Sequence, residues 1–232
     1  MAALTDKLAL VTGASRGLGY AVALKLAAEG AHVIALARTV GGLEELDDAI
    51  TAAGGACTLT PLDITDDAGL ERLGAAIHGR WGKLDMLVHC AAQDAPLSPA
   101  EHAADKDFDK AMKVNARATQ RLIRVTDPLL KAADNAQAVF IDDTIAAGEK
   151  FNASYGASKA AARAVVQSYA SETQRTGALV WFANPPAMPT AIRGRAHPGE
   201  DQSTLTSCET VAQAITDHIT ARDIAAGSTA DL

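Results

Sequence analysis

The chain has 232 residues, a net charge of −7 and 48% hydrophobic residues, of which few are aromatic. This length suits one α/β domain, and the absence of a basic run argues against a nucleic-acid partner. Cys57, Cys90 and Cys208 lack the spacing of a metal site or disulfide framework, so we expect no metal and a cytoplasmic location. No apolar run approaches the roughly 20 residues that cross a bilayer, and the amino terminus does not resemble a signal peptide, so we expect no membrane partner.

Short apolar runs alternate with longer helical segments along most of the chain. The pattern predicts strands at 8–13, 32–38, 57–63, 84–91, 138–142 and 178–186, and helices at 17–29, 42–55, 67–80, 106–132, 153–175 and 207–221. We expect Pro128 to kink or end the main part of the long helix. The alternation predicts an α/β fold, with a single doubly wound parallel sheet of the Rossmann type and helices on both faces.

No linker divides the sequence, so we expect one domain over residues 1–232. The regular pattern fades after Pro186, where a polar segment rich in proline and glycine predicts a short substrate loop or flap around 187–206. The tail from Ala221 shows no convincing final strand.

A glycine-rich loop, VTGASRGLG, follows the first strand and opens the first helix. Gly13, Gly17 and Gly19 would allow a tight turn and a close approach of phosphate groups, which the free N–H groups of the helix would then bind. A purely structural turn is the alternative, but the position in the first strand–helix connection favours nucleotide binding.

The stretch Thr12–Gly19 resembles the TGxxxGxG motif of the short-chain dehydrogenase/reductase superfamily. The resemblance covers residues 5–190 and implies an NAD(P)-binding domain, a nicotinamide cofactor, a small carbonyl or alcohol substrate and a Ser-Tyr-Lys-Asn catalytic set. It implies a cofactor site formed by Gly13, Ser15, Arg16, Gly17, Leu18, Gly19, Arg38, Asp63, Ile64, Cys90, Ala91, Ala92, Tyr155, Lys159, Pro185 and Thr190.

The end of the second strand bears on the choice of cofactor. An acidic residue there binds the ribose 2′-hydroxyl of NAD, whereas an arginine accommodates the 2′-phosphate of NADP. This strand ends in Arg38 with no acid, and Arg16 lies in the glycine loop, so we expect NADP(H) to be preferred and NAD(H) to be possible. A solvated Arg38 is the alternative. Asp63 matches the family acid that contacts adenine, or it is a turn residue.

Tyr155 and Lys159 lie four residues apart on a predicted helix and therefore on one face. The lysine ammonium is expected to lower the phenol pKa from its usual value of about 10, so that Tyr155 exchanges a proton with substrate as hydride moves. The segment YGASKAA fits the family motif closely. By resemblance, Lys159 also binds the ribose, Asn115 supports a water beside the lysine, and Thr190 contacts the nicotinamide carboxamide. Asn115 is otherwise an ordinary helix residue, and Thr190 a turn residue.

Three segments depart from the family pattern. The family NNAG is replaced by His89–Ala92, where we expect a structural or cofactor-flanking histidine and a groove narrowed by added Cβ atoms. The family PG is replaced by Pro185-Pro186. The catalytic serine position falls on Asp143 or Thr144, depending on the alignment. Thr144 could donate a hydroxyl, whereas an ionised Asp143 could not, and it would raise the pKa of the tyrosine. Alternatively, Asp142 and Asp143 are solvated loop acids.

These features favour an oxidoreductase that transfers a hydride between NADP(H) and a carbonyl or alcohol. The three departures favour instead a nucleotide-binding relative with little or no dehydrogenase activity, serving as a sensor or assembly subunit. The substrate is expected at the carboxyl ends of the strands. The resemblance also implies a homodimer or homotetramer through the helices at 106–130 and 153–175.

Overall fold

The computed structural model describes residues 2–175 and 177–232. Those residues contain one sheet of parallel strands in the order β3-β2-β1-β4-β5-β6-β7. The strands are β1 Leu8–Thr12, β2 His32–Ala37, β3 Ala56–Pro61, β4 Met86–His89, β5 Gln137–Ile141, β6 Leu179–Asn184 and β7 Thr229–Asp231. The predicted doubly wound parallel sheet is therefore confirmed.

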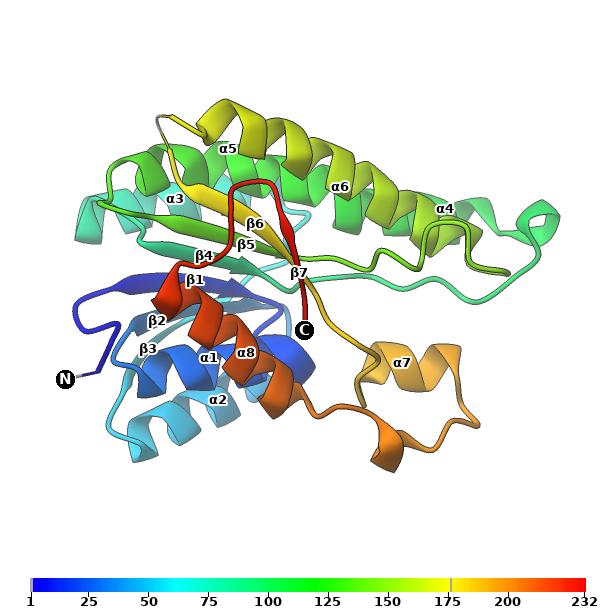
Figure 1. The fold of residues 1–232 in the computed structure, drawn as a ribbon, viewed down its shortest axis with the longest axis horizontal. Coiled ribbons are helices and arrows are strands. Elements are labelled where there is room, and N and C mark those ends of the chain that lie inside the picture. Colours follow the sequence, from blue (N-terminus) through cyan, green and yellow to red (C-terminus); the bar gives the residue numbers. More distant parts are fainter. Residues whose placement is uncertain (1, 176) are drawn as a thin grey trace.

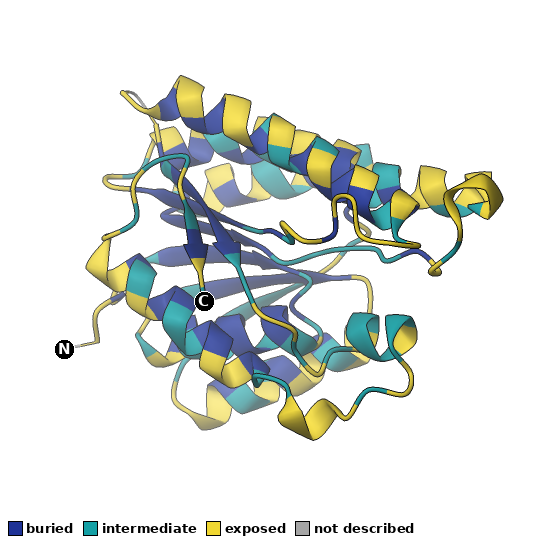
Figure 2. Cartoon of the chain, turned by 45° about the vertical axis from the view of Figure 1, so that its right-hand side comes forward, coloured by how far each residue is buried: buried dark blue, intermediate teal, exposed yellow. Residues whose placement is uncertain are grey.

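Helices cover both faces of the sheet, with α1, α2 and α8 on one side and α3 to α6 on the other (Figure 1). The helices are α1 Gly17–Ala28, α2 Val40–Ala52, α3 Asp67–Trp81, α4 Asp105–Ala111, α5 Ala118–Lys131, α6 Ala153–Thr173, α7 Ala191–Ala196 and α8 Cys208–Ala221, with short 3₁₀ turns at Ala100–His102 and Gln202–Thr204. The central strands are buried on both faces, whereas the helices expose their outer sides (Figure 2). Aliphatic runs such as Leu8–Thr12 suit strands covered in this way.

The long helix predicted at 106–132 is divided by a π-helical segment, Met112–Arg117, between α4 and α5. A π turn adds a residue to the helical repeat and often marks a functional position. Pro128 does not end the helix, which continues to Lys131. The proline lies in the last turn, where only one upstream carbonyl loses its helical partner.

The carboxyl-terminal tail forms a strand, so the expectation of no final strand is wrong. Thr229–Asp231 pairs in parallel with the end of β6. The Asn184 side chain donates a hydrogen bond of 2.7 Å to the Asp231 carboxylate. The local pattern did not predict this strand because the tail lacks a β-branched run. Its pairing depends on the neighbouring strand rather than on local propensity.

The strand order reverses between β1 and β4, because successive connections run outward from these two strands in opposite directions. Such a switch point leaves a crevice outside the carboxyl ends of the strands, where ligands bind. The two strand ends are tied together by the Ala91 N–H, which donates to the Thr12 hydroxyl at 3.2 Å. In the part of the chain that the structure describes, no helix combines the length and apolar character needed to cross a membrane.

Candidate active site

The glycine-rich loop follows β1 and has a backbone that other residues would strain. Gly13 and Gly17 have φ angles of 71° and 56°, in the region that L-residues disfavour. A Cβ added at Gly19 would collide with the Gly13 carbonyl oxygen. Helix α1 begins at Gly17 with no acidic residue in its first turn. Its free N–H groups and partial positive charge therefore remain available to an anion.

Two arginines stand beside this loop. Arg16 and Arg38 are exposed and form no salt bridge with any residue in the described ranges. One Arg16 nitrogen donates to the Thr39 hydroxyl at 3.4 Å. The Asp63 carboxylate accepts two hydrogen bonds of 2.8 Å from the backbone and hydroxyl of Thr65, so it stabilises its own turn while lining the same cavity. The helix that follows is capped by Asp66 instead.

A cavity of about 490 Å³ extends from these arginines along the carboxyl ends of the strands to Tyr155. Every residue that the family resemblance places against the cofactor lines it. Ala92 has no positive φ, so a Cβ is accommodated there. A glycine cradle at the turn, a helix N-terminus and two unpaired guanidinium groups suit a dinucleotide with an extra phosphate.

Tyr155 and Lys159 lie one turn apart on α6, and both line the cavity. The Lys159 ammonium donates to the Ile141 carbonyl at 2.7 Å, at the end of β5. Burial lowers the pKa of Lys159, although the nearby Asp142 and Asp143 carboxylates act in the opposite direction. The lysine is thus held at the base of the site rather than extended into solvent.

Asn115 lies in the π-helical segment, where it is buried and fully bonded. Its amide nitrogen donates to the Gln93 carbonyl and the Ser158 hydroxyl, each at 2.8 Å, and its oxygen accepts from the Gln93 N–H at 2.7 Å. Asn115 does not line the main cavity. It lines, together with Lys159, an adjoining void of about 20 Å³, which is large enough for one water molecule.

The serine position is occupied by a carboxylate. Asp143 lines the cavity beside Tyr155, whereas Thr144 is exposed, lies outside the cavity lining and donates its backbone N–H to the Asn184 side chain at 3.2 Å. Of the two alternatives for the serine position, the structure thus places Asp143, and not Thr144, in the cavity lining. Asp142 is buried and forms an ion pair with Arg163. Both adjacent acids line the cavity, but only Asp143 has no salt bridge among the described residues.

The phenol of Tyr155 is more basic than the sequence suggested. Burial contributes most, and the charge of the nearby Asp143 carboxylate adds to it, so together they raise the pKa of Tyr155 above its usual value. The ammonium of Lys159 was expected to lower this pKa, but it does not outweigh those two effects. Tyr155 is therefore a neutral phenol, able to donate a proton.

His89 and Cys90 replace side-chain amides of the family pattern, and both are neutral. The His89 ring bridges the Thr12 hydroxyl at 2.7 Å and the Thr119 hydroxyl at 2.9 Å. Burial, with a smaller contribution from the Lys159 charge, lowers the pKa of His89 to about 3. Burial raises the pKa of the Cys90 thiol to about 12. His89 is thus a structural link between β1 and α5.

Charged residues that the sequence did not single out line the opposite end of the cavity from the arginine pair. Arg195 in α7 binds Asp94, which follows β4, with a nitrogen–oxygen distance of 2.8 Å. Arg193 makes two hydrogen bonds, of 2.6 and 2.7 Å, to Glu200. Glu149 also lines this end. Residues 191–196 stand on the same side of the molecule as the start of α4 (Figure 1). No sequence signal separates such pairs from ordinary solvated loop charges.

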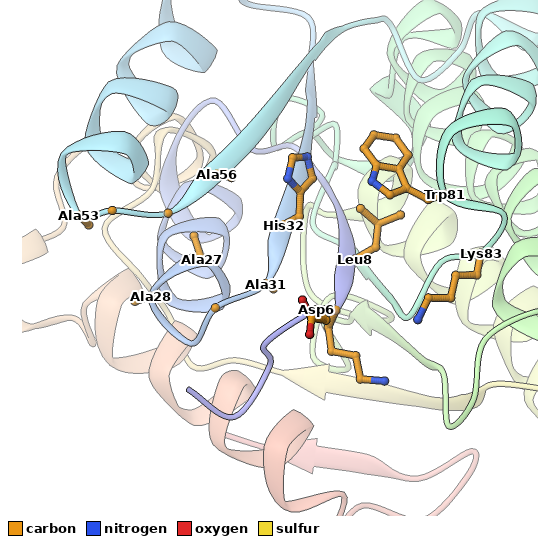
Figure 3. Close-up of a pocket in the computed structure, with 14 residues that line it drawn as sticks. Asp6, Leu8, Ala27, Ala28, Ala31, His32, Ala53, Ala56, Trp81 and Lys83 are labelled. Carbon is orange, nitrogen blue, oxygen red and sulfur yellow. The ribbon is translucent and has the colours of Figure 1, made fainter. Parts of the chain in front are cut away.

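A second hollow, of about 550 Å³, lies at the amino ends of β1, β2 and β3 (Figure 3). The His32 and Trp81 rings pack beside it at a tilt of 44°, with centroids 5.4 Å apart. Lys7 and Lys83 at its rim both pair with the Asp85 carboxylate, at 3.1 and 3.0 Å. This hollow is as large as the first cavity, but it has no loop of the Thr12–Gly19 kind and both of its lysines are paired, so the candidate chemistry lies at the carboxyl ends of the strands.

Comparison with known proteins agrees with this geometry. The family model for short chain dehydrogenase matches residues 7–201. The chain therefore belongs to the short-chain dehydrogenase/reductase family of oxidoreductases, with the Rossmann-type fold and a nicotinamide cofactor. Among solved structures, the oxidoreductase yciK from Escherichia coli is 28% identical, with a TM-score of 0.94, over 99% of this chain and 96% of that one.

Two further relatives bear on cofactor and chemistry. A short-chain dehydrogenase from Escherichia coli CFT073, solved in complex with NADPH, is 28% identical with a TM-score of 0.90, over 99% of this chain and 98% of that one. The fatty acyl-CoA reductase of Acinetobacter baylyi is 36% identical over 160 residues, which are 67% of this chain and 53% of that enzyme. The chain thus matches about half the length of this reductase.

Proposed function

We propose that this protein is an NADP(H)-dependent oxidoreductase that exchanges a hydride with a small substrate containing a carbonyl, an alcohol or a related group. The observation that carries the proposal is the single cavity that joins the glycine loop and Arg38 at one end to Tyr155 and Lys159 at the other. The bound nicotinamide would supply or accept the hydride. Each remaining role falls to residues of this chain.

The preference for NADP(H) rests on the two unpaired arginines beside the glycine loop. Arg38 follows β2 at the place where an acid would bind the ribose hydroxyls of NAD. Its guanidinium would accommodate the 2′-phosphate of NADP there instead. Arg16, held near Thr39, approaches the same region. The NADPH complex of the Escherichia coli CFT073 relative supports this assignment.

The proposed proton path begins at the Tyr155 hydroxyl and leads toward Lys159. Tyr155 would donate its proton to the substrate atom that gains the electron pair. Lys159 would hold the cofactor ribose, as the family resemblance implies. The void of about 20 Å³ that Lys159 and Asn115 line would hold a water molecule, and this water would pass a proton toward solvent. Asn115 would act as a positioning residue, since its three hydrogen bonds fix the segment after β4 to α6.

The segment around 187–206 would act as the substrate flap of a single domain spanning residues 1–232. Its α7 carries Arg195, whose bond to Asp94 joins the flap to the segment after β4. Thr190 caps α7 by accepting the Arg193 N–H at 3.2 Å and packs near Gly17. The flap would therefore be anchored at the glycine loop and tied across the cavity mouth.

The test measures cofactor binding and turnover separately. NADPH and NADH are titrated by fluorescence, and NADPH oxidation is then followed with a panel of aldehydes, ketones and cyclic imines, with Tyr155→Phe as the control variant. We expect NADPH to bind more tightly than NADH and turnover to require Tyr155. Binding without turnover on the whole panel would favour a nucleotide-binding sensor or subunit, and failure to bind either cofactor would refute the proposal.

A further inference from the structure

We propose that the substrate of this site carries nitrogen at the reacting bond, as a protonated imine that is reduced to an amine, and that Asp143 is the residue that selects it. The inference rests on the proposed function and adds a substrate class to it. The geometry that supports it is a carboxylate, rather than a hydroxyl, beside the proton-donating Tyr155.

The position of Asp143 is fixed by the loop that carries it. Its carboxylate accepts the Ala146 N–H at 3.2 Å. The Ala146 carbonyl packs so closely on Gly156 of α6 that a Cβ at residue 156 would collide with it. Because Tyr155 precedes Gly156 on the same helix, this contact sets the carboxylate and the phenol side by side. Asp143 is thus held toward the cavity, and the exposed Thr144 is held away from it.

Three other acids near the substrate end are compensated by cations. Asp142 pairs with Arg163, Asp94 with Arg195, and Glu200 with Arg193. Among the described residues, the acids that line the cavity without forming a salt bridge are Asp63 at the nucleotide end and Asp143 and Glu149 at the substrate end.

Two cations interact electrostatically with Asp143, but neither forms a salt bridge with it among the described residues. The Lys159 ammonium is bonded to the Ile141 carbonyl at 2.7 Å. Arg193, which faces both unpaired acids, makes its short hydrogen bonds to Glu200. A substrate cation could therefore find an unpaired carboxylate in this site.

A carboxylate discriminates between the C=O bond of a carbonyl and the C=N bond of a protonated imine. It accepts hydrogen bonds and donates none, so it cannot polarise a carbonyl oxygen and would repel the alkoxide that forms there. A protonated imine presents an N–H donor and a positive charge, which form a charge-assisted hydrogen bond to a carboxylate. The protonated carbon–nitrogen bond is also the stronger hydride acceptor.

The proposed step balances with NADPH as the two-electron reductant. The imine carbon gains the hydride and forms a C–H bond, and the π pair of the C=N bond moves onto nitrogen. The nitrogen keeps the proton it already carries and becomes a neutral amine, while NADPH becomes NADP⁺. If the imine arrives unprotonated, Tyr155 donates that proton to nitrogen and regains one through the Lys159 side of the site. Asp143 neither gains nor loses a proton in this step.

The first experiment measures binding and requires no turnover. The complex of the protein with NADP⁺ is titrated with tetrahydroisoquinoline, a cation at neutral pH, and with tetralol, a neutral alcohol of similar skeleton. We expect the amine to bind about ten- to a hundredfold more tightly, as for a charge-assisted hydrogen bond. Asp143→Asn, which keeps the side-chain size, should abolish this preference, and Glu149→Gln should reduce it less. Equal binding of the two ligands, no binding of the amine, or a preference that survives Asp143→Asn would overturn the inference.

The second experiment measures specificity by NADPH oxidation with dihydroisoquinoline and tetralone. We expect the wild-type protein to favour the imine in kcat/KM, and Asp143→Ser to shift the ratio toward the ketone. Loss of NADPH binding in the wild-type protein would refute the proposed function itself. Ketone turnover that is faster than imine turnover, and unchanged by Asp143→Ser, would leave the proposed function intact and refute only the choice of substrate.

Discussion

The two ends of the cavity are built in different ways. The nucleotide end is formed mainly by backbone: Gly13 and Gly17 have positive φ angles, and Gly19 has no room for a Cβ. The chemical end is formed by the side chains of Tyr155, Lys159 and Asp143. The Asp143 carboxylate raises the pKa of Tyr155 and acts in the same direction on Lys159. The glycine loop keeps the family pattern, whereas the family serine beside the tyrosine is replaced by Asp143.

Cofactor binding and substrate chemistry are therefore separate requirements, although the family pattern includes residues for both. Backbone N–H groups and glycines recognise phosphate whatever substrate is used, so their geometry can persist while the chemistry changes. A single side chain beside the tyrosine decides which group can be polarised. The following variants test whether the two ends are independent.

The largest effect is expected at the chemical end, from Tyr155→Phe. Removing the hydroxyl deletes the donor that protonates a carbonyl oxygen or an unprotonated imine, and general acid catalysis contributes about 10²- to 10⁴-fold to the rate with such substrates. We expect kcat to fall by that order while the affinity for NADPH changes little, because the phosphates bind at the far end of the cavity. Stopped-flow turnover and fluorescence titration measure the two quantities. A parallel loss of NADPH affinity would show that the ends are coupled.

At the nucleotide end, Gly19→Ala is expected to weaken cofactor binding. The added Cβ collides with the Gly13 carbonyl oxygen, and overpacking of this kind costs about 1–3 kcal/mol. We expect NADPH and NADH to lose affinity alike, by about tenfold or more. The matched control is Gly79→Ala in α3, where a Cβ meets nothing within 4 Å. Calorimetric titration of both variants checks this, and equal behaviour of the pair would contradict the assigned role of the loop.

Arg38→Gln tests how the nucleotide end distinguishes NADPH from NADH. A charge-assisted hydrogen bond to the 2′-phosphate is lost, so the dissociation constant for NADPH should rise by about ten- to a hundredfold. NADH lacks that phosphate, and its affinity should stay unchanged. Lys25→Gln, at a basic residue of α1 outside the cavity lining, serves as a charge control. A variant that binds NADPH as tightly as the wild-type protein would leave Arg38 as a solvated surface charge.

The smallest change is expected in the titration of Tyr155. Burial and the Asp143 carboxylate raise the pKa of this phenol, so it should remain protonated well into the alkaline range. Asp143→Asn removes the negative charge that disfavours phenolate, and the pKa of Tyr155 should therefore fall. Difference absorbance between each protein and its Tyr155→Phe derivative isolates this phenol. An unchanged or higher titration midpoint in Asp143→Asn would show that burial alone sets the shift.

Most of the fold followed from local patterns, and the exceptions have tertiary causes. Alternating aliphatic strands and amphipathic helices predicted the parallel sheet, because a strand covered on both faces must be apolar along its length. The strand at Thr229–Asp231 was missed since its hydrogen bonds come from β6. The π-helical turn at Asn115 follows from no local pattern and was expected as a kink only from the family resemblance, because its partners, Gln93 and Ser158, lie far away in the sequence.

The sequence by itself determined the family, the glycine loop and the Tyr155/Lys159 pair, since each depends on spacing within one segment and on helical or turn geometry. Only the tertiary structure decided which group faces the tyrosine. A one-residue difference in the alignment separates Asp143 from Thr144, and the packing of the Ala146 carbonyl on Gly156 settles it. The same packing supplies the burial and charge that raise the pKa of Tyr155, effects that arise only when distant segments meet.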